Sequence, residues 1–210
     1  MDGPDARPVA PGRLLVSPEQ IAARIAELAA EIDAAYARVD GPVVLLCVLK
    51  GSLFFTADLA RALTIPLEID AIAVRSYGAG TQSSGTVQLL KDVTTPLDGR
   101  HVLMVEDVID TGLTTAFLHE HVARHHPASL RLVSLLDKPG RRLREVRIDF
   151  RGFVLADEFV VGYGLDLDER FRNLPGVHAL DTGGRLSSAP PSSADDGLGE
   201  SPPPGASAPR

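Results

Sequence analysis

The sequence predicts an α/β domain built on a mainly parallel central β-sheet that is flanked by helices. A continuous apolar run occupies 43–49, and two further mainly apolar segments lie at 102–105 and 130–136. Such runs are typical of strands buried on both faces, as in parallel sheets. Segments with helical spacing separate them, and strands that alternate with helices favour a parallel arrangement.

The first helix is marked by its beginning. Ser17-Pro18-Glu19-Gln20 places Ser at the N-cap, Pro at the first helical position and Gln at the third, which is a capping-box pattern. Apolar residues then follow at helical spacing: Ile21, Ile25, Leu28, Ile32 and Tyr36. The remaining elements are expected, in chain order, as a strand at 43–49, a helix at 53–63, strands at 68–74, 86–90 and 102–105, a helix at 113–125, a strand at 130–136 and further strand character at 153–161.

Both ends of the chain differ in composition from the middle. Residues 1–13 hold three prolines, two glycines and four charges, which predicts a flexible N-terminal arm. Residues 183–210 are dominated by Pro, Ser, Gly and Ala and contain no aromatic residue. Such a segment buries too little apolar surface to offset its ordering entropy, so we expect a disordered tail. The folded domain is therefore expected at 14–182.

Charge and composition narrow the class of protein. The formal charge is −7, from 21 basic and 28 acidic side chains, which argues against general binding to nucleic acid or an anionic membrane. The single cysteine, Cys47, forms neither an intramolecular disulfide nor a cysteine-based zinc site. No signal peptide is apparent in residues 1–13, and the longest apolar run ends at Lys50, far short of a membrane span. We expect a soluble, cytoplasmic protein.

The strongest chemical signal follows the apolar run at 102–105. Glu106 and Asp107 come first, and Asp110-Thr111-Gly112 then precedes the helix predicted from Leu113. A helix N-terminus offers free N–H groups and a positive dipole end, and glycine allows close approach of an anion. Hydroxyl donors are added by Thr111, Thr114 and Thr115. The run predicts a phosphate cradle without a basic side chain, beside two carboxylates that suit sugar hydroxyls.

Simpler explanations exist for each part of this run. Acid pairs at strand ends also serve as helix caps or metal sites, and Thr-Gly turns are common. The complete run in this order favours the phosphate site. The chain has no Gly-x-x-x-x-Gly-Lys-Ser/Thr run, which excludes a P-loop NTPase.

The run from His101 to Thr115 resembles the phosphoribosyl pyrophosphate (PRPP) signature of type I phosphoribosyltransferases, and specifically of hypoxanthine-guanine phosphoribosyltransferases. The similarity extends from about Leu14 to Asp181. It implies the type I fold, with a small hood and a mobile lid loop. It also implies Mg²⁺-dependent transfer of 5-phosphoribosyl from PRPP to N9 of hypoxanthine or guanine, which gives IMP or GMP plus pyrophosphate. A homodimer or homotetramer is the implied assembly.

The same resemblance assigns the PRPP contacts. Lys50-Gly51 resembles the family's pyrophosphate loop, where a peptide is often cis, and Arg172 matches an arginine near the pyrophosphate. The cradle residues Asp110, Thr111, Gly112, Leu113 and Thr114 would hold the 5′-phosphate. Leu113 stands where some members carry Lys, so the cradle must rely on amides and hydroxyls. Taken alone, an ordinary Lys-Gly strand end and a surface ion pair explain Lys50-Gly51 and Arg172 equally well.

Lid, base and metal contacts are also implied by the resemblance. Ser76 and Tyr77 match the lid, which closes over substrates and excludes water. Lys138 matches a lysine that donates to the purine 6-oxo group, Phe159 the stacking residue, and Val160 a residue that offers backbone groups to the base. The base-binding segment ends at Asp166, which would coordinate Mg²⁺, as would Glu106 and Asp107. Asp110 matches the proton-handling group at purine N7.

Two other functions remain compatible with these motifs. One is a nucleotide-sensing, RNA-binding regulator on the same fold, which the acidic balance disfavours. The other is a phosphoribosyltransferase for another base, such as xanthine, adenine or a pyrimidine. Lys138 and the 159–166 segment favour a 6-oxopurine over adenine, and the overall match disfavours a pyrimidine. The residues decide neither the preference between hypoxanthine and guanine nor the choice between dimer and tetramer.

Overall fold

The computed structural model describes residues 10–76 and 87–181. Its elements, in chain order, are β1 (Ala10–Val16), α1 (Pro18–Tyr36), β2 (Val43–Leu49), α2 (Leu53–Ala62), β3 (Leu67–Ser76), β4 (Val87–Lys91), β5 (His101–Ile109), α3 (Leu113–Ala123), β6 (Ser129–Asp137), the 3-10 turn η1 (Pro139–Arg141), β7 (Phe150–Val154), β8 (Val160–Val161) and β9 (Val177–Asp181). No helix in these described ranges is long and apolar enough to cross a membrane.

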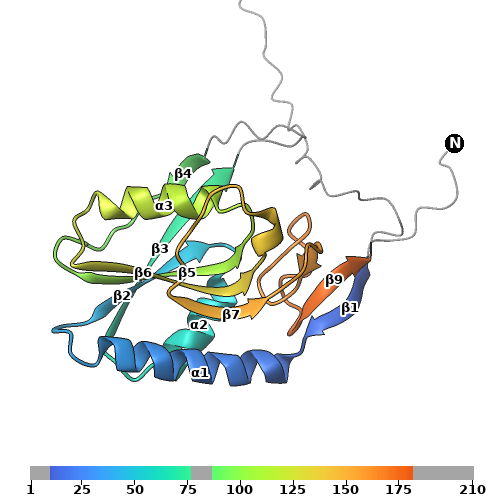
Figure 1. Ribbon diagram of the computed structural model, residues 1–210, viewed down its shortest axis with the longest axis horizontal. Coiled ribbons are helices and arrows are strands. Elements are labelled where there is room, and N and C mark those ends of the chain that lie inside the picture. The colour runs from blue at the N-terminus through green and yellow to red at the C-terminus, as the bar shows by residue number, and fades with distance from the viewer. Residues whose placement is uncertain (1–9, 77–86, 182–210) are drawn as a thin grey trace, which may run out of the picture.

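A six-stranded sheet in the order β4-β3-β2-β5-β6-β7 forms the centre of the molecule (Figure 1). The five strands from β3 to β7 in this order run parallel, and only the edge strand β4 is antiparallel. Helices α1 and α2 cover one face, and α3 covers the other (Figure 1). The predicted α/β class with a mainly parallel sheet is confirmed.

Strand β2 is apolar throughout because both of its faces are buried. In β2, Val43 and Leu45 pack in the cluster that includes α1 and α2, whereas Val44 and Leu46 pack in the cluster that includes α3. Full burial of each such side chain contributes about 1.5–3 kcal/mol. Alternate residues of a strand point to opposite faces, so a run without polar residues is what a central parallel strand requires.

A second, three-stranded antiparallel sheet, β1-β9-β8, is the small hood that the resemblance implied (Figure 1). The expected flexible arm at 1–13 disagrees with the structure over residues 10–13, because these belong to β1 and Ala10 pairs with Asp181. Residues 1–9 and 182–210 lie outside the described residues. β1 pairs with β9, and most of the chain lies between these two strands, so local composition could not reveal the pairing.

Other boundaries also differ from the sequence prediction. Strand character at 153–161 divides into β7 at the edge of the main sheet and β8 in the hood. The strand expected to end at residue 105 continues to Ile109, because its later residues pair with β6. Glu106 and Asp107 therefore lie within a strand. The capping box of α1 is confirmed, with Ser17 Oγ accepting from the Gln20 N–H.

Candidate phosphate- and base-binding site

Three segments with predicted site residues meet at one edge of the main sheet. β2, β5 and β6 are parallel neighbours, so their carboxyl ends lie at the same edge, where ligands bind in open α/β sheets. The hood strands β1 and β9 stand beyond that edge (Figure 1). Lys50 pairs with Glu169, and Lys138 donates to the Glu158 backbone oxygen, so both lysines link this edge to the segments that lead into and out of β8.

The turn before α3 forms the predicted cradle. Gly112 is the N-cap with φ of 80°, a conformation that favours glycine, and no side chain caps the helix. A Cβ at Gly112 would lie 2.2 Å from the backbone oxygen of Arg144. Thr111 and Leu113 flank the glycine, and Thr114 follows in the first turn. The helix N-terminus therefore presents backbone N–H groups that an anion can accept from.

A neighbouring loop fixes this turn from the side. The Thr111 backbone oxygen accepts from the N–H groups of Leu143 (2.9 Å) and Arg144 (3.0 Å). Arg142 donates to the Asp110 backbone oxygen at 3.2 Å and forms an ion pair with the buried Asp137. Sequence reasoning missed Arg142. The adjacent Arg141-Arg142 pair, just after Lys138 at the end of β6, was the available signal.

Glu106 and Asp107 point to opposite faces of the sheet, as consecutive strand residues must. Glu106 is 5% exposed and accepts from Thr115 Oγ1 of α3 at 3.2 Å. Burial, together with the adjacent Asp107 charge, raises the pKa of Glu106 well above its ordinary value. The Thr115 hydroxyl, expected in the cradle, is instead buried against this carboxyl group.

Asp107 lies against the turn after β2. A Cβ at Gly51 would lie 1.7 Å from Asp107 Oδ2, and a Cβ at Gly164 would lie 2.0 Å from the Gly51 backbone oxygen. Only glycines permit this approach. The cis peptide bond in this turn joins Leu49 and Lys50. Burial raises the pKa of Asp107 to about 6, with the Arg172 charge opposing the shift and the Asp166 charge adding to it.

A network of ion pairs close enough to influence Asp107 joins the segment before β9 to the turn after β2. Arg172 contacts Asp166 at 2.8 Å and donates to the Gly164 backbone oxygen at 2.7 Å. Glu169 accepts from Arg172 and also pairs with Lys50 at 2.9 Å. The structure thus brings Lys50, Asp166 and Arg172 together. Glu169 was not predicted, because an exposed glutamate just after Asp166 and Asp168 gives no distinctive pattern.

Lys138 lies at the other end of the site, just after β6. It is 6% exposed and donates to the Glu158 backbone oxygen at 2.6 Å. Burial lowers the pKa of Lys138, and the negative charge of Asp110 partly opposes this shift. Asp110 Oδ1 lies 3.3 Å from Arg141 Nε, yet it is buried and accepts no hydrogen bond from the described residues. This oxygen is therefore ion-paired with Arg141 but keeps its capacity to accept a hydrogen bond among the described residues.

Phe159 and Val160 lead into the hood next to Lys138. The Val160 side chain is buried in the main core cluster, so only its backbone is available to a ligand. Phe159 is partly buried and packs against the cluster of Val161, Leu167 and Leu180. Of the predicted lid residues, Ser76 is the last residue of β3, and Tyr77 lies outside the described residues.

The three residues predicted to bind metal do not form one cluster. Glu106 points toward α3, whereas Asp107 points toward Gly51. Asp107 and Asp166 act on each other electrostatically on one side of the site. Two carboxylates whose repulsion a cation would relieve, beside an open edge for phosphate oxygens, fit the Mg²⁺ preference for few protein ligands.

The chain is similar to known proteins over most of its length. A family model described as "Phosphoribosyl transferase domain" matches residues 15–168. The hypoxanthine-guanine phosphoribosyltransferase of Mycobacterium avium is 47% identical over 172 residues, covering 80% of this chain and 85% of the relative. That of Bacillus subtilis is 44% identical over 168 residues, covering 80% of this chain and 92% of the relative.

A solved structure extends the likeness to three dimensions. The crystal structure of a hypoxanthine-guanine phosphoribosyltransferase from Bacillus anthracis superposes with a TM-score of 0.76 at 41% sequence identity. It covers 81% of this chain and 99% of the relative.

Proposed function

This chain belongs to the phosphoribosyltransferase family, and we propose that it performs purine salvage as a hypoxanthine-guanine phosphoribosyltransferase. The reaction is transfer of 5-phosphoribosyl from PRPP to N9 of hypoxanthine or guanine, giving IMP or GMP plus pyrophosphate. One observation carries the proposal beyond the family relationship. Lys138 is buried and feels the charge of Asp110, whose buried Oδ1 accepts no hydrogen bond from the described residues.

Lys138 accounts for the choice of base. An ammonium has donors only, so it suits an oxygen at purine C6 and disfavours the amino group of adenine. Because Lys138 is buried, a base that cannot accept from it leaves an unpaired donor in the site, and such mismatches are rejected strongly. Phe159 would stack on the purine, and Val160 would offer backbone groups to its edge.

We assign to Asp110 the removal of the proton from purine N7. Asp110 Oδ1, which accepts no hydrogen bond from the described residues, is the acceptor that purine N7–H requires, and removal of that proton makes N9 a better nucleophile. Lys138 lies close enough to influence this charge. The same turn holds the cradle, so the backbone that binds the 5′-phosphate also positions the group that handles the proton.

The phosphate and ribose contacts divide between the two faces of β5. The cradle N–H groups from Thr111 to Thr114 would hold the 5′-phosphate, with Glu106 and Asp107 near the ribose hydroxyls. Asp107, against Gly51, faces the turn that we assign to pyrophosphate, where Lys50 and Arg172 supply positive charge. When bound, Mg²⁺ supplies a Lewis acid that neutralises the departing pyrophosphate, and Asp166 with Asp107 would hold it.

We further place the protein in the cytoplasm, as a homodimer or homotetramer. Leu53 and Phe54 at the start of α2 are 51% and 42% exposed. Phe54 also lines a cavity of about 570 Å³ with Ile21, Ile25, Tyr163 and Pro175. Exposed apolar groups around such a cavity favour burial against a second copy. Sedimentation equilibrium of the purified chain checks the assembly.

The proposal is tested by pyrophosphate release with PRPP and Mg²⁺, using hypoxanthine, guanine, xanthine and adenine in parallel. We expect fast turnover with hypoxanthine or guanine, and none after EDTA. Activity confined to adenine or xanthine would overturn the proposed base pocket and keep the PRPP site. Binding of PRPP without turnover of any base would favour the regulator instead.

A further inference from the structure

One group of three metal-ligating side chains in residues 10–76 and 87–181 lies outside the site described above. It consists of Asp92, just after β4, and His121 and His125, at the end of α3. One ligand atom from each residue lies within 4.8 Å of the other two. We propose that these three side chains bind a divalent transition-metal ion of the zinc class.

The two histidines are positioned by the helix. Residues four apart lie on one face of an α-helix, which is the spacing by which paired histidines bind zinc. α3 ends at Ala123, but the turn continues because Arg124 keeps helical angles and the His125 N–H donates to the Val122 oxygen at 3.1 Å. The imidazole rings approach to 5.6 Å between centroids. A helix C-terminus also carries partial negative charge, which favours a cation.

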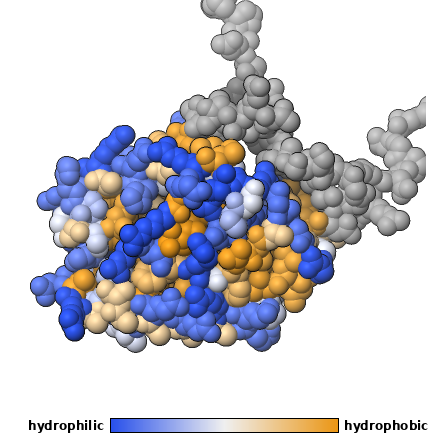
Figure 2. All heavy atoms as spheres, viewed as in Figure 1, coloured by the Kyte–Doolittle hydropathy of each residue, from blue (hydrophilic) through white to orange (hydrophobic). Residues whose placement is uncertain are grey.

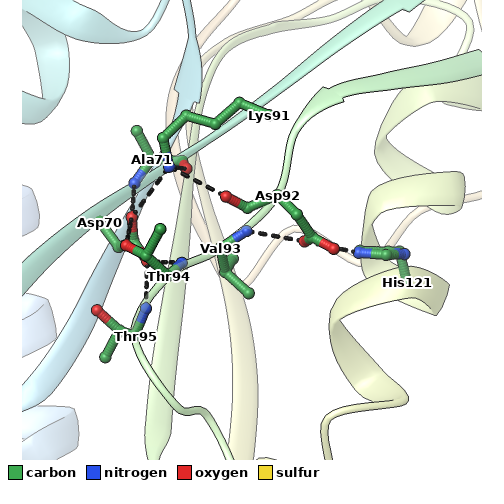
Figure 3. Close-up of polar contacts among 8 residues, drawn as sticks. All are labelled: Asp70, Ala71, Lys91, Asp92, Val93, Thr94, Thr95 and His121. Atoms are coloured by element: carbon green, nitrogen blue, oxygen red, sulfur yellow. Dashed lines mark hydrogen bonds and ion pairs between the residues drawn. The ribbon is translucent and has the colours of Figure 1, made fainter.

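The carboxylate is held in place independently of the histidines. Asp70 in β3 accepts from the N–H groups of Thr94 (2.6 Å) and Thr95 (2.8 Å), which fixes the segment after β4 (Figure 3). Asp92 Oδ1 accepts from the Val93 N–H at 2.8 Å and contacts His121 Nε2 at 2.9 Å. The Asp92 side chain therefore points at the helix without needing an ion.

Neighbouring positive charge does not occupy the Asp92 carboxylate. Lys91, next to it in sequence, directs its ammonium to Asp70 and to the backbone oxygens of Ala71 and Asp92 (Figure 3). The His121 ring stacks on Phe117 at an interplanar angle of 13°. This contact limits ring rotation and keeps Nε2 toward Asp92.

The ligand set selects the kind of ion. Imidazole nitrogen suits zinc, copper and nickel, whereas Mg²⁺ and Ca²⁺ prefer oxygen. A tetrahedral zinc ion with bonds of about 2.0–2.1 Å holds its ligand atoms roughly 3.3 Å apart. The His121 Nε2–Asp92 Oδ1 separation of 2.9 Å is slightly shorter than this, and one ligand atom from each of the three residues lies within 4.8 Å of the other two, so small side-chain rotations would fit the ion. Three protein ligands leave one position for water, as in exchangeable rather than closed sites.

The proposed metal site lies at the opposite end of α3 from the phosphate cradle. The eleven residues of α3 span about 16 Å, with the phosphate cradle at one end and the histidines at the other. A bound ion would join β4 at the sheet edge to the C-terminal end of α3. The proposal therefore does not depend on the proposed function.

The test is titration of the untagged full chain with Zn²⁺ in excess Mg²⁺, which saturates oxygen sites, with competition against a chromophoric chelator. We expect one zinc site, with affinity reduced roughly 100-fold or more in His121→Ala, His125→Ala and Asp92→Asn. His119→Ala is the matched control, because His119 is exposed on the same helix outside the cluster. Asp166→Asn should also keep the zinc site. Each variant's melting temperature without metal verifies folding.

A second readout is the visible spectrum with Co²⁺ in place of zinc. We expect the intense visible absorption of four-coordinate Co²⁺ in the wild type and in His119→Ala. The same absorption should be absent in His125→Ala. Zn²⁺ should also raise the melting temperature of the wild type but not of His125→Ala. Unchanged affinity in His125→Ala, equal loss in His119→Ala, or loss in Asp166→Asn would each overturn the proposal.

Discussion

At the scale of single residues, the candidate site buries charges that water would otherwise solvate. Burial of a charge is costly unless the group is paired or changes its protonation state. Asp137 is paired with Arg142 and Arg151, whereas the pKa values of Glu106 and Asp107 rise. Such shifted groups in a cleft are typical of functional sites.

Replacement of Asp110 by Asn tests the acceptor at purine N7. An amide of the same shape keeps the cradle turn but cannot take a proton, so kcat should fall by about 100-fold or more. The affinity for PRPP should stay within a few-fold. Steady-state turnover with hypoxanthine measures the first, and equilibrium binding of PRPP the second. Unchanged kcat would remove Asp110 from the mechanism.

The pH dependence of PRPP use tests Asp107. Its raised pKa of about 6 means that the carboxylate forms only as pH rises through 6. Because the proposed role requires the charged form, kcat/KM for PRPP should increase between pH 5 and pH 7 and then level off. Asp107→Asn should be weak at every pH and lack this rise. A wild-type profile that is flat over the same range would contradict the assignment.

The same carboxyl group has the opposite effect on folding. A raised folded-state pKa means that the folded chain holds its proton more tightly than the unfolded chain, whose aspartate pKa is about 3.9. Its contribution to the free energy of unfolding is therefore greatest below pH 4 and is lost as pH rises through 6. The position is thus unfavourable for stability at neutral pH and is explained by function.

At the scale of elements, the candidate site forms where the turn between β2 and α2 comes close to β5 and to the hood. Gly51→Ala places a methyl group where Asp107 Oδ2 now lies, and the aspartate must rotate away. A misplacement of this size costs about 100-fold in kcat/KM, whereas the melting temperature should fall by only a few degrees because a side chain, not backbone, yields.

The matched control for that variant is Gly140→Ala. A Cβ there meets no atom within 4 Å, so activity and melting temperature should both stay near wild type. Equal loss of kcat/KM in the two variants would show that the Gly51 effect is not due to contact with Asp107.

The β3–β4 pair depends on one buried carboxylate. Burial acts to raise the pKa of Asp70. Hydrogen bonds from the N–H groups of Thr95, Thr94 and Ala71 together lower it by more, so the net shift is downward. Asp70→Asn removes the charge from these bonds and should reduce the free energy of unfolding by about 2–3 kcal/mol, or roughly 4–12 °C in melting temperature. Asp98→Asn, an exposed control, should change neither.

The difference between wild type and Asp70→Asn should depend on pH. A lowered folded-state pKa makes the contribution complete above the unfolded pKa of about 3.9. It is then lost as pH falls toward the folded-state value. Thermal melts at pH 7 and pH 3 should therefore show a large difference at the first and a smaller one at the second. A constant difference would assign the effect to packing instead.

At the scale of the whole molecule, the hood is closed by its most distant segments. β1 and β9 pair along their length, so residues near both ends of the described chain support the base site. A chain ending at residue 182 should keep wild-type turnover and melting temperature, as the compositional prediction of a dispensable tail requires. Reduced turnover in that chain would give the tail a role.

Deletion of residues 1–13 is the informative comparison. It removes residues 10–13 of β1 and their pairing with β9, whereas deletion of residues 1–9 spares them. The longer deletion should lower the melting temperature by several degrees more than the shorter one. Equal melting temperatures would mean that the first half of β1 contributes nothing to the hood.

The sequence by itself determined the central architecture and most of the candidate site. β2, β5 and β6 were predicted because strands buried on both faces are rich in apolar residues, and α1 because its capping box is local. The strand ends were the places to search because a chain that leaves a parallel strand delivers its next residues to the ligand edge. The family resemblance then assigned roles there to Lys50, Gly51, Asp110 and Lys138.

Only the tertiary structure decided how those residues face one another. It placed Glu106 and Asp107 on opposite faces because the strand continues to Ile109, and it turned Thr115 away from the cradle. It added Arg142 and Glu169 to the site, and it built the hood from β1 and β9. It also brought Asp92 to His121 and His125. The physical reason is common to all of these: pairing and burial depend on contacts between segments distant in sequence, which local pattern does not encode.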